Sequence, residues 1–199
     1  MIYLLRHGET LWNRERRIQG HLDSALSPRG EAQARAMGRT LAGLLDGHTL
    51  TLMTSPLGRT RQTAALVAQA IGHDAARIVA DDRLKEISWG GWEGFTRPEI
   101  DRRWPGALAE RYADAATRWS HCPPGGESFA SSSARAMDWL HAARKIDGVV
   151  VAVAHGAIGR VLRGLHARLG PEEALALDEP QDAFFRLHAR GIDRIAAER

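Results

Sequence analysis

Two histidines with the same surroundings are the residues of this chain best suited to chemistry. The apolar run at 2–5 leads into Arg6 and His7, the apolar run at 149–154 leads into His155, and a glycine follows each histidine. A neutral imidazole nitrogen can attack phosphorus or an acyl carbon and hold a covalent intermediate. Because both histidines follow a strand-like run and precede a glycine turn, we expect them to share one site.

The arginine beside the first histidine favours phosphoryl transfer. The guanidinium fork of Arg6 can bind two phosphate oxygens at once, whereas acyl transfer more typically requires an oxyanion hole and a serine or cysteine nucleophile. The alternative is that His7 only caps a turn, and a motif of three residues does not decide between the two. The rest of the chain must supply the evidence.

The elements that position these residues alternate between strand and helix in the first part of the chain. Serine followed by proline, as at Ser27 and Ser55, is typical of an N-cap and a first helical residue, and we expect Gly47 and Gly72 to end the two helices. In chain order the patterns predict a strand at 2–5, a helix at 28–45, a strand at 50–54 and a helix at 56–71.

The second part of the chain continues the alternation after an interruption. Residues 88–124 are rich in tryptophan, glycine and proline, and they indicate an insertion over the site. We therefore expect one α/β domain over residues 1–199, a three-layer α/β/α sandwich with a mostly parallel central sheet and a helical lid insertion at 88–124. The further elements predicted are strands at 78–80 and 149–154, short helices near 99–104 and 108–119, helices at 128–145 and 157–169, and a closing hairpin of 182–188 with 192–196.

Three predicted strand ends carry the candidate residues. In open α/β sheets, ligands bind beyond the carboxyl ends of the strands. Arg6 with His7, Ser55 with Arg59, and His155 all follow such ends. Three coincident placements favour a functional site over three unrelated structural histidines and arginines.

Composition limits the function classes. The 199 residues are 44% hydrophobic and 26% charged, which is ordinary for a soluble protein with a substantial core. The net charge of +3 is scattered among acids, so nucleic-acid binding is disfavoured. The single cysteine, Cys122, excludes an intramolecular disulfide. The apolar runs are much shorter than the roughly 20 residues of a membrane span, and Met1 starts a strand rather than a signal peptide. We expect a cytoplasmic protein without a membrane partner.

Four motifs in order resemble the signatures of the histidine phosphatase superfamily, the phosphoglycerate-mutase-like proteins. The segment from Trp12 to Ser27 is also similar to the branch that holds broad-specificity phosphatases and cofactor-dependent mutases, and the resemblance covers nearly the whole chain. The four motifs are Leu5-Arg6-His7-Gly8-Glu9-Thr10, Ser55-Pro56-Leu57-Gly58-Arg59-Thr60, Leu84-Lys85-Glu86-Ile87 and Ala154-His155-Gly156.

The resemblance implies a role for each catalytic candidate. His7 would be the nucleophile, and Arg6, Arg59 and His155 would surround the equatorial oxygens of the phosphoryl group in transfer. His7 must be neutral to attack, and the two cations beside it oppose its protonation. Glu86 would donate a proton to the leaving alkoxide and then activate water, a role that requires a pKa above the usual value of about 4.3.

A second group of residues would bind substrate. Asn13 and Gln19 match positions where family members contact phosphate or substrate, and Ser55 would steady the nucleophile or cap its helix. The adjacent pair Asp81 and Asp82 has no further ligand at suitable spacing, so we predict neither a metal ion nor another cofactor.

The family divides into phosphatases and mutases, and this chain fits the phosphatases better. Mutases carry a longer insertion with a basic cluster for the substrate carboxylate, whereas Glu86 and His155 are only 69 positions apart here, and the arginines between them do not reproduce that cluster. We expect Trp89, Trp92, Trp104 and Trp119 to form a partly apolar cover over the pocket, or else to pack the insertion against the body.

The predicted protein is thus a metal-independent phosphomonoesterase of the histidine acid phosphatase type. It would act on a small phosphorylated metabolite through a phosphohistidine. The alternatives are a cofactor-dependent phosphoglycerate mutase and, from another class, a non-catalytic module that binds phosphorylated ligands. The sequence leaves the physiological substrate and the oligomeric state, a homodimer included, open.

Overall fold

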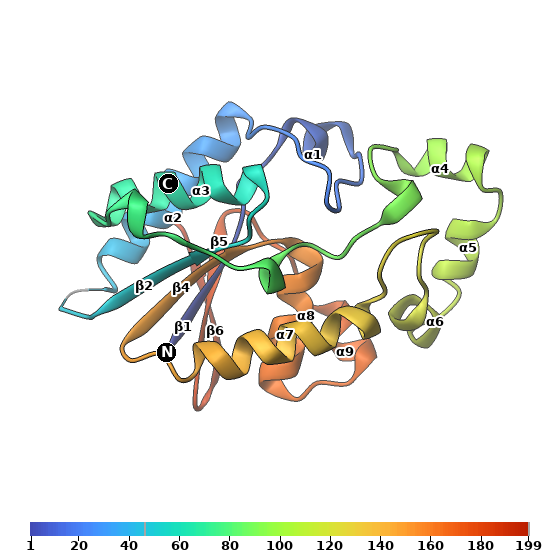
Figure 1. The fold of residues 1–199 in the computed structure, drawn as a ribbon. Coiled ribbons are helices and arrows are strands. Elements are labelled where there is room, and N and C mark those ends of the chain that lie inside the picture. Colours follow the sequence, from blue (N-terminus) through green and yellow to red (C-terminus); the bar gives the residue numbers. More distant parts are fainter. Residues whose placement is uncertain (46, 199) are drawn as a thin grey trace.

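The computed structural model describes residues 1–45 and 47–198, and within them one six-stranded sheet forms the centre of an α/β fold (Figure 1). The strand order is β3-β2-β4-β1-β5-β6, in which the first four strands are parallel, β5 is antiparallel to β1, and β6 is antiparallel to β5. The strands are β1 (Ile2–Arg6), β2 (Leu50–Thr54), β3 (Val79–Ala80), β4 (Val149–Ala154), β5 (Ala183–His188) and β6 (Gly191–Ala196).

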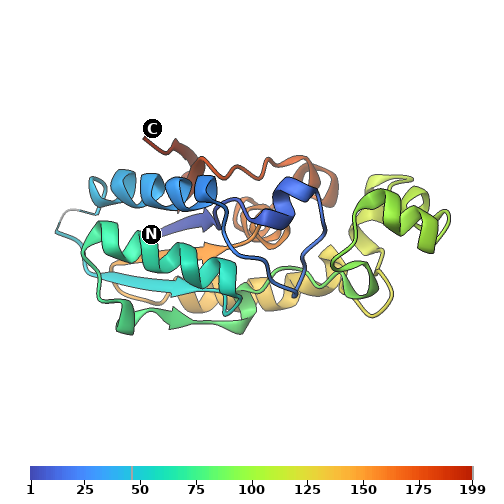
Figure 2. The ribbon, with the colours of Figure 1, turned by 90° about the horizontal axis from the view of Figure 1, so that it is seen from above.

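Alternating side chains of the central strands build a core on each face of the sheet. Ile2 and Leu4 of β1 join a cluster with one pair of helices, whereas Tyr3 and Leu5 join a cluster with another pair. This follows from the two-residue period of a strand. Each aliphatic side chain buried in this way contributes about 1.5–3 kcal/mol. The first pair is α7 (Phe129–Ala143) with α8 (Gly156–Ala167), and the second is α2 (Pro28–Ala42) with α3 (Gly58–Ile71) (Figure 2). The predicted three-layer α/β/α architecture is confirmed.

The helix that follows Ser27 ends earlier than the sequence suggested. Ser27 caps it as predicted, accepting a hydrogen bond from the Gly30 N–H, but the C-cap is Gly43 rather than Gly47. Leu45, which the prediction placed in the helix, lies beyond its end and packs into the cluster of the α2 face.

The helix after β2 begins later than predicted. Leu57 is its N-cap residue and its first helical residue is Gly58, so Ser55 does not cap this helix. The Ser55 hydroxyl is instead engaged by His155, as described below. A tertiary contact has therefore displaced a local capping preference.

The insertion forms its own small helical cluster beyond the end of the sheet, at the right of Figure 1. Trp92, Ile100 and Leu108 are its buried centre. The helix predicted over 108–119 is divided into two, because Asp114 caps the second one by accepting a hydrogen bond of 2.7 Å from the Thr117 N–H. The three helices are α4 (Arg97–Arg103), α5 (Ala107–Arg111) and α6 (Ala115–Ser120).

Two short helices were not predicted, α1 (Leu11–Glu15) and α9 (Pro171–Ala176). α1 contributes Asn13 and Glu15 to the site that is described below, and α9 packs against α6 and α8. None of the helices in the described residues has the length and apolar character needed to cross a membrane.

Candidate active site

The candidate residues meet at the carboxyl edge of three neighbouring strands. The register pairs Arg6 of β1 with Ala154 of β4, and the His7 N–H donates to the Ala154 carbonyl at 3.1 Å. The Ser55 N–H likewise donates to the Val153 carbonyl at 3.0 Å. Because β4 lies between β1 and β2, the residues that follow the three strands are brought side by side. The predicted convergence of these strand ends is present.

Hydrogen bonding fixes the tautomer of His7, which is 3% exposed. Its Nδ1 lies 2.7 Å from the Gly8 carbonyl oxygen, which can only accept, so Nδ1 carries the proton. Its Nε2 lies 3.3 Å from Nε of Arg59, which can only donate, so Nε2 holds the free lone pair. Burial lowers the pKa of His7 well below 6.5, and the charges of Arg59 and Arg6 lower it further. His7 is therefore neutral near pH 7.

Arg59 is only 1% exposed, and hydrogen bonds fix its guanidinium in place. Its Nη2 donates to the Gly20 carbonyl at 2.7 Å, and its Nη1 donates to the Leu22 carbonyl at 2.8 Å and to Asp23 Oδ1 at 3.1 Å. The Asp23 carboxylate also accepts the backbone N–H groups of Gly58 and Arg59, at the uncapped start of α3. Asp23 thus caps the N-terminus of α3 and also binds the guanidinium of Arg59.

His155 contacts both His7 and Ser55. The two imidazole centroids are 5.2 Å apart with an angle of 64° between the ring planes, and His155 Nε2 lies 2.8 Å from the Ser55 hydroxyl. Burial, followed by the charge of Arg59, lowers the pKa of His155 well below 6.5. Its Nδ1 is buried and has no hydrogen-bond partner among the described residues. Ser55 therefore fixes the His155 ring through Nε2, and Nδ1 makes no hydrogen bond to the described residues.

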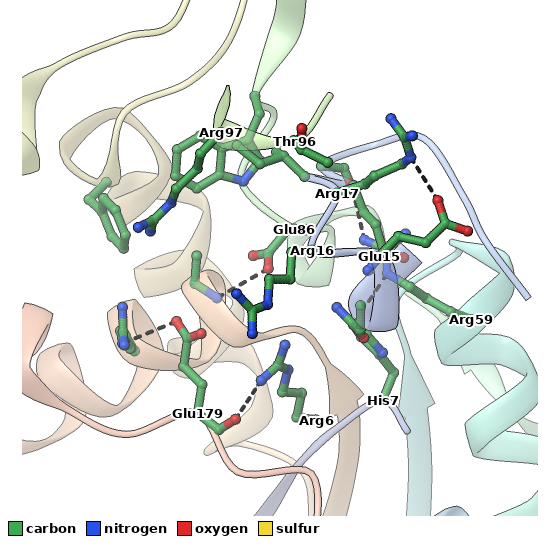
Figure 3. Close-up of a pocket in the computed structure, with 18 of the residues that line it drawn as sticks. Arg6, His7, Glu15, Arg16, Arg17, Arg59, Glu86, Thr96, Arg97 and Glu179 are labelled. Atoms are coloured by element: carbon green, nitrogen blue, oxygen red, sulfur yellow. Dashed lines mark hydrogen bonds and ion pairs between the residues drawn. The ribbon is translucent and has the colours of Figure 1, made fainter. Parts of the chain in front are cut away.

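Arg6 points into the site beside Glu179 (Figure 3). Its Nη1 donates to the Glu179 carbonyl oxygen, while its Nε is buried and finds no partner in the described part of the chain. The Glu179 carboxylate forms an ion pair with Arg160 of α8, with 3.1 Å between Oε1 and Nε. The segment before β5 therefore supplies both an anchor for Arg6 and a paired acid.

The Glu86 carboxylate is bound at the N-terminus of α8. Oε2 accepts the Ala157 N–H at 3.1 Å, and Oε1 accepts the Ile158 N–H at 2.9 Å and the Ile87 N–H at 3.0 Å. The first N–H groups of a helix have no partner within the helix and carry partial positive charge, so they suit a carboxylate. Glu86 and the N-terminal turn after His155 are therefore linked directly.

Arg135 of α7 fixes the loop that carries Glu86. Its guanidinium donates to the carbonyls of Arg83, Lys85 and Glu86 at 2.9, 2.7 and 3.1 Å, and it pairs with Glu127 at 2.9 Å. One half-buried guanidinium thus holds three backbone carbonyls of the turn at residues 83–86. Nothing in the sequence pattern indicated this role.

Of the predicted substrate-binding residues, Asn13 and Gln19 line the cavity and Ser55 does not. Asn13 Oδ1 accepts hydrogen bonds from the Thr10 N–H at 3.1 Å and from Gln181 at 3.1 Å, so its orientation is fixed. Gln19 is 8% exposed, and its Oε1 is without a partner within residues 1–45 and 47–198. Ser55 lies behind His155.

The cavity in front of His7 has a volume of about 840 Å³ and a cationic lining. Of the four tryptophans expected to cover it, only Trp89 lines it, so the predicted aromatic cover is wrong for Trp92, Trp104 and Trp119, which pack inside the insertion or against α7. The lining contains three acids, Glu15, Glu86 and Glu179, and seven arginines, Arg6, Arg16, Arg17, Arg59, Arg97, Arg118 and Arg160. This excess of arginines over acids favours an anionic ligand.

No cluster of three or more histidine, cysteine, aspartate or glutamate side chains in the described ranges is arranged to hold a metal ion.

A family model agrees with this geometry. The model of the histidine phosphatase superfamily (branch 1) matches residues 2–189. The chain belongs to the histidine phosphatase superfamily. Its four predicted motifs lie within the matched region, and three of them form the strand ends described above.

Individual relatives divide between the two activities of the superfamily. A protein of Salmonella paratyphi C (strain RKS4594) named probable phosphoglycerate mutase GpmB is 40% identical over 145 residues, which are 71% of this chain and 60% of that protein. The matched part thus spans about 60% of the length of the curated relatives. Among solved structures, a mycobacterial glucosyl-3-phosphoglycerate phosphatase has a TM-score of 0.78 at 29% identity, with 98% of this chain and 97% of that chain covered. Bacillus stearothermophilus YhfR has a TM-score of 0.79 at 28% identity, with 99% and 95% covered.

Several site residues of this superfamily member escaped the sequence reasoning. Asp23 and Arg135 act on catalytic candidates through space, and Glu179 and Gln181 come from a segment without a motif. Arg16 had no signal in the sequence either, and the structure shows that it ends α1 in the left-handed conformation with a φ of 59°, which is uncommon for a residue other than glycine. Its side chain lines the cavity between Arg6 and Glu86 (Figure 3).

Proposed function

We propose that this protein hydrolyses small phosphomonoesters through a phosphohistidine formed on Nε2 of His7. The observation that carries the proposal is the fixed tautomer of His7: Nδ1–H is bound to the Gly8 carbonyl, and the Nε2 lone pair faces Arg59. A neutral imidazole held in this way is ready to attack phosphorus. The cationic lining of the cavity supports a phosphorylated substrate.

In the first half of the reaction, Nε2 of His7 forms a bond to phosphorus and the ester P–O bond breaks. Arg6, Arg59 and the free Nδ1 of His155 donate to the phosphoryl oxygens, where preoriented donors stabilise the developing charge. His155 can donate there because the Ser55 hydroxyl is able to satisfy its Nε2. Glu86 in its protonated form gives a proton to the leaving alkoxide.

In the second half, water attacks the same phosphorus atom. The Glu86 carboxylate takes a proton from the water as its oxygen bonds to phosphorus, and the P–N bond to His7 breaks. Inorganic phosphate leaves, and the imidazole recovers its lone pair. We place Asn13 and Gln19 at the substrate, since both line the cavity beside His7.

Trapping the phosphoenzyme tests the proposal. Wild-type protein is incubated with a phosphomonoester labelled in its phosphoryl group and quenched in base, and we expect an acid-labile label that is absent from His7→Ala. A matched control is His48→Ala, an exposed histidine outside the site, which keeps the label. Activity that persists with a chelator supports the metal-independent reaction. Binding of substrate without label or product would favour the non-catalytic phospho-ligand module.

Phosphoglycerate mutase is the second candidate, because relatives that are 40% identical carry that name. It predicts transfer of the phosphoryl group back to a second hydroxyl rather than to water. Incubation with 3-phosphoglycerate and the bisphosphoglycerate primer separates the two: we expect release of phosphate, whereas isomerisation faster than hydrolysis would assign the chain to the mutases.

We place substrate specificity in residues 88–124 of a single domain. Trp89, Arg97 and Arg118 of this insertion line the cavity, and the Arg111 guanidinium lies 4.5 Å from the centroid of the Trp89 ring and supports that wall from behind. Exchanging the segment for that of a related phosphatase should change the ratio of kcat/KM values across a panel of monoesters. An unchanged profile would contradict this assignment.

A further inference from the structure

A second cavity lies at the opposite end of the sheet from the candidate active site. Its volume is about 740 Å³, and it is formed by the start of β1, the end of β5, and the C-terminal turns of α7 and α8. Met1, the chain end marked N in Figure 1, is one of its lining residues. None of the described residues that line it also lines the catalytic cavity.

The lining of this distal cavity has the character of a ligand site. Pockets for small molecules typically have about 300–1,000 Å³ and combine an apolar surface with a few polar groups. Met1, which is 44% exposed, and the half-buried Met137 and Leu165 supply apolar surface here, whereas Ile2 and Leu187 are nearly fully buried. The charged and imidazole side chains that line it are His141, Arg144, His166, Arg168 and His188, and no carboxylate of the described residues is among the lining.

The cations of the distal cavity lack acidic partners. Within the described ranges, neither Arg144 nor Arg168 has a carboxylate oxygen within 4 Å, and Asp193 pairs with His188 and Arg186 instead. Arg144 donates to Nδ1 of His166 at 3.2 Å. A guanidinium that is bound to an imidazole keeps its charge uncompensated.

Both ring nitrogens of His166 are engaged in hydrogen bonds. Its Nδ1 accepts from Arg144, because a guanidinium can only donate, and its Nε2 donates to the His188 carbonyl oxygen at 3.1 Å. The imidazole thereby orients the Arg144 guanidinium at the cavity.

Compensation of the helix dipoles does not explain the whole arrangement. Arg144 and Arg168 are the C-cap residues of α7 and α8, where a cation stabilises a helix by about 0.3–1 kcal/mol. However, neither guanidinium has a hydrogen bond to a helix carbonyl in the described part of the chain, so their N–H groups stay available. The apolar surface between the two helix ends is also unnecessary for this purpose.

We infer that the distal cavity binds a small organic anion with an apolar body. The carboxylate, sulfonate or phosphate group lies between Arg144 and Arg168, and the apolar body lies over Met137 and Leu165. A guanidinium without a carboxylate partner favours an anionic group, and the accessible apolar surface favours an apolar body over inorganic phosphate alone. The site is separate from the phosphoryl-transfer site and does not depend on the activity proposed above.

A pair of fluorescent probes tests the inference on the full chain. The anionic probe is 8-anilinonaphthalene-1-sulfonate, and the uncharged N-phenyl-1-naphthylamine has the same rings without the sulfonate. We expect the sulfonate to bind at least about tenfold more tightly than the amine. The double change R144Q/R168N should weaken sulfonate binding by about tenfold or more and leave amine binding nearly unchanged. Asparagine is chosen because it tolerates the left-handed φ of 59° at Arg168.

The matched control removes two exposed arginines elsewhere. R39Q/R61Q changes the net charge equally on α2 and α3, and it should bind the sulfonate as the wild type does. The single change R144Q, which leaves the cap of α8 intact, should show part of the loss. Equal sulfonate affinity in R144Q/R168N and R39Q/R61Q would overturn the inference, because the probe would then bind elsewhere, for example in the catalytic cavity. Equal affinity for the two probes, or no saturable binding, would overturn it as well.

Discussion

Replacing Asp23 by alanine should weaken both the fold and catalysis, although Asp23 touches no substrate. Its carboxylate accepts the N–H groups of Gly58 and Arg59 at the start of α3 and the Nη1 of Arg59 at 3.1 Å. The N-cap residue Leu57 offers no side-chain acceptor. Alanine at position 23 therefore leaves the helix start uncapped and removes the carboxylate partner of a buried guanidinium.

The size of the stability loss follows from these contacts. Loss of an N-cap acceptor costs about 1 kcal/mol. Loss of a hydrogen bond to a charged group costs about 1.5–3 kcal/mol, and the lower end applies because the Asp23 side chain is 38% exposed and water can partly replace it. The sum of about 2–3 kcal/mol corresponds to a decrease in Tm of about 4–12 °C for a chain of this length.

The catalytic loss should be moderate, because Arg59 keeps its bonds to the Gly20 and Leu22 carbonyls. We expect kcat to fall by about tenfold to a hundredfold, as for other small misplacements of a catalytic group. Asp23→Asn, which keeps one acceptor oxygen, should lie between the wild type and alanine.

Urea unfolding and steady-state hydrolysis of one monoester measure the two effects. Asp74→Ala is the matched control, since Asp74 caps the exposed turn at 75–77 by accepting the Ala76 N–H and lies outside the cavity. It should lose cap stability without loss of kcat. The reasoning fails if Asp23→Ala unfolds like the wild type, or if its kcat loss equals that of the control.

Three further predictions concern support of the site. Arg135→Ala should lower kcat by about tenfold or more with little change in KM, because the loop that carries Glu86 loses three hydrogen bonds to its carbonyls. Arg135→Lys should recover part of the loss. Equal effects on KM and kcat would contradict this positioning role. The pKa values of His7 and His155 are lowered in the folded chain, so below about pH 6.5 these imidazoles are protonated in the unfolded chain but not in the folded one. The free energy of unfolding therefore falls as the pH drops below about 6.5, by about 1.4 kcal/mol per pH unit for each ring. Urea unfolding at about pH 7.5, 6 and 5 measures this slope, which His7→Gln should reduce by one ring's share; an unchanged slope would refute it. Gly30→Ala should cost about 2–3 kcal/mol of unfolding free energy, since its Cβ would lie 1.9 Å from a backbone oxygen of the turn that follows β1, and a wild-type urea midpoint would show that this turn yields without cost.

The alternating and continuous apolar runs of the sequence were sufficient to predict the layers of the fold. β2 and β4 have the predicted bounds, because a short apolar run bounded by turn residues is a local signal. Helix ends were less predictable. The helix after Ser27 ends at Gly43 rather than Gly47, and Ser55 does not cap the helix after β2, since its hydroxyl contacts His155.

Arg6, His7, Arg59 and His155 were predictable because they follow strands, whose carboxyl ends meet at one edge of a parallel sheet. Glu86 was indicated only by the resemblance of its motif to the superfamily. The sequence did not show which nitrogen of His7 is free, that Asp23 caps α3, or that Arg135 holds the Glu86 loop.

The sequence by itself determined the order of the main strands and helices and placed His7, Arg6, Arg59 and His155 after strands, because periodicity and strand ends are properties of neighbouring residues. Glu86 joined this candidate set only through the resemblance of its motif to the superfamily. The tertiary structure alone decided the tautomer of His7, the partners of Arg59 and the cationic wall of the cavity. These depend on groups many positions apart, whose distances are set only when the two cores pack against the sheet.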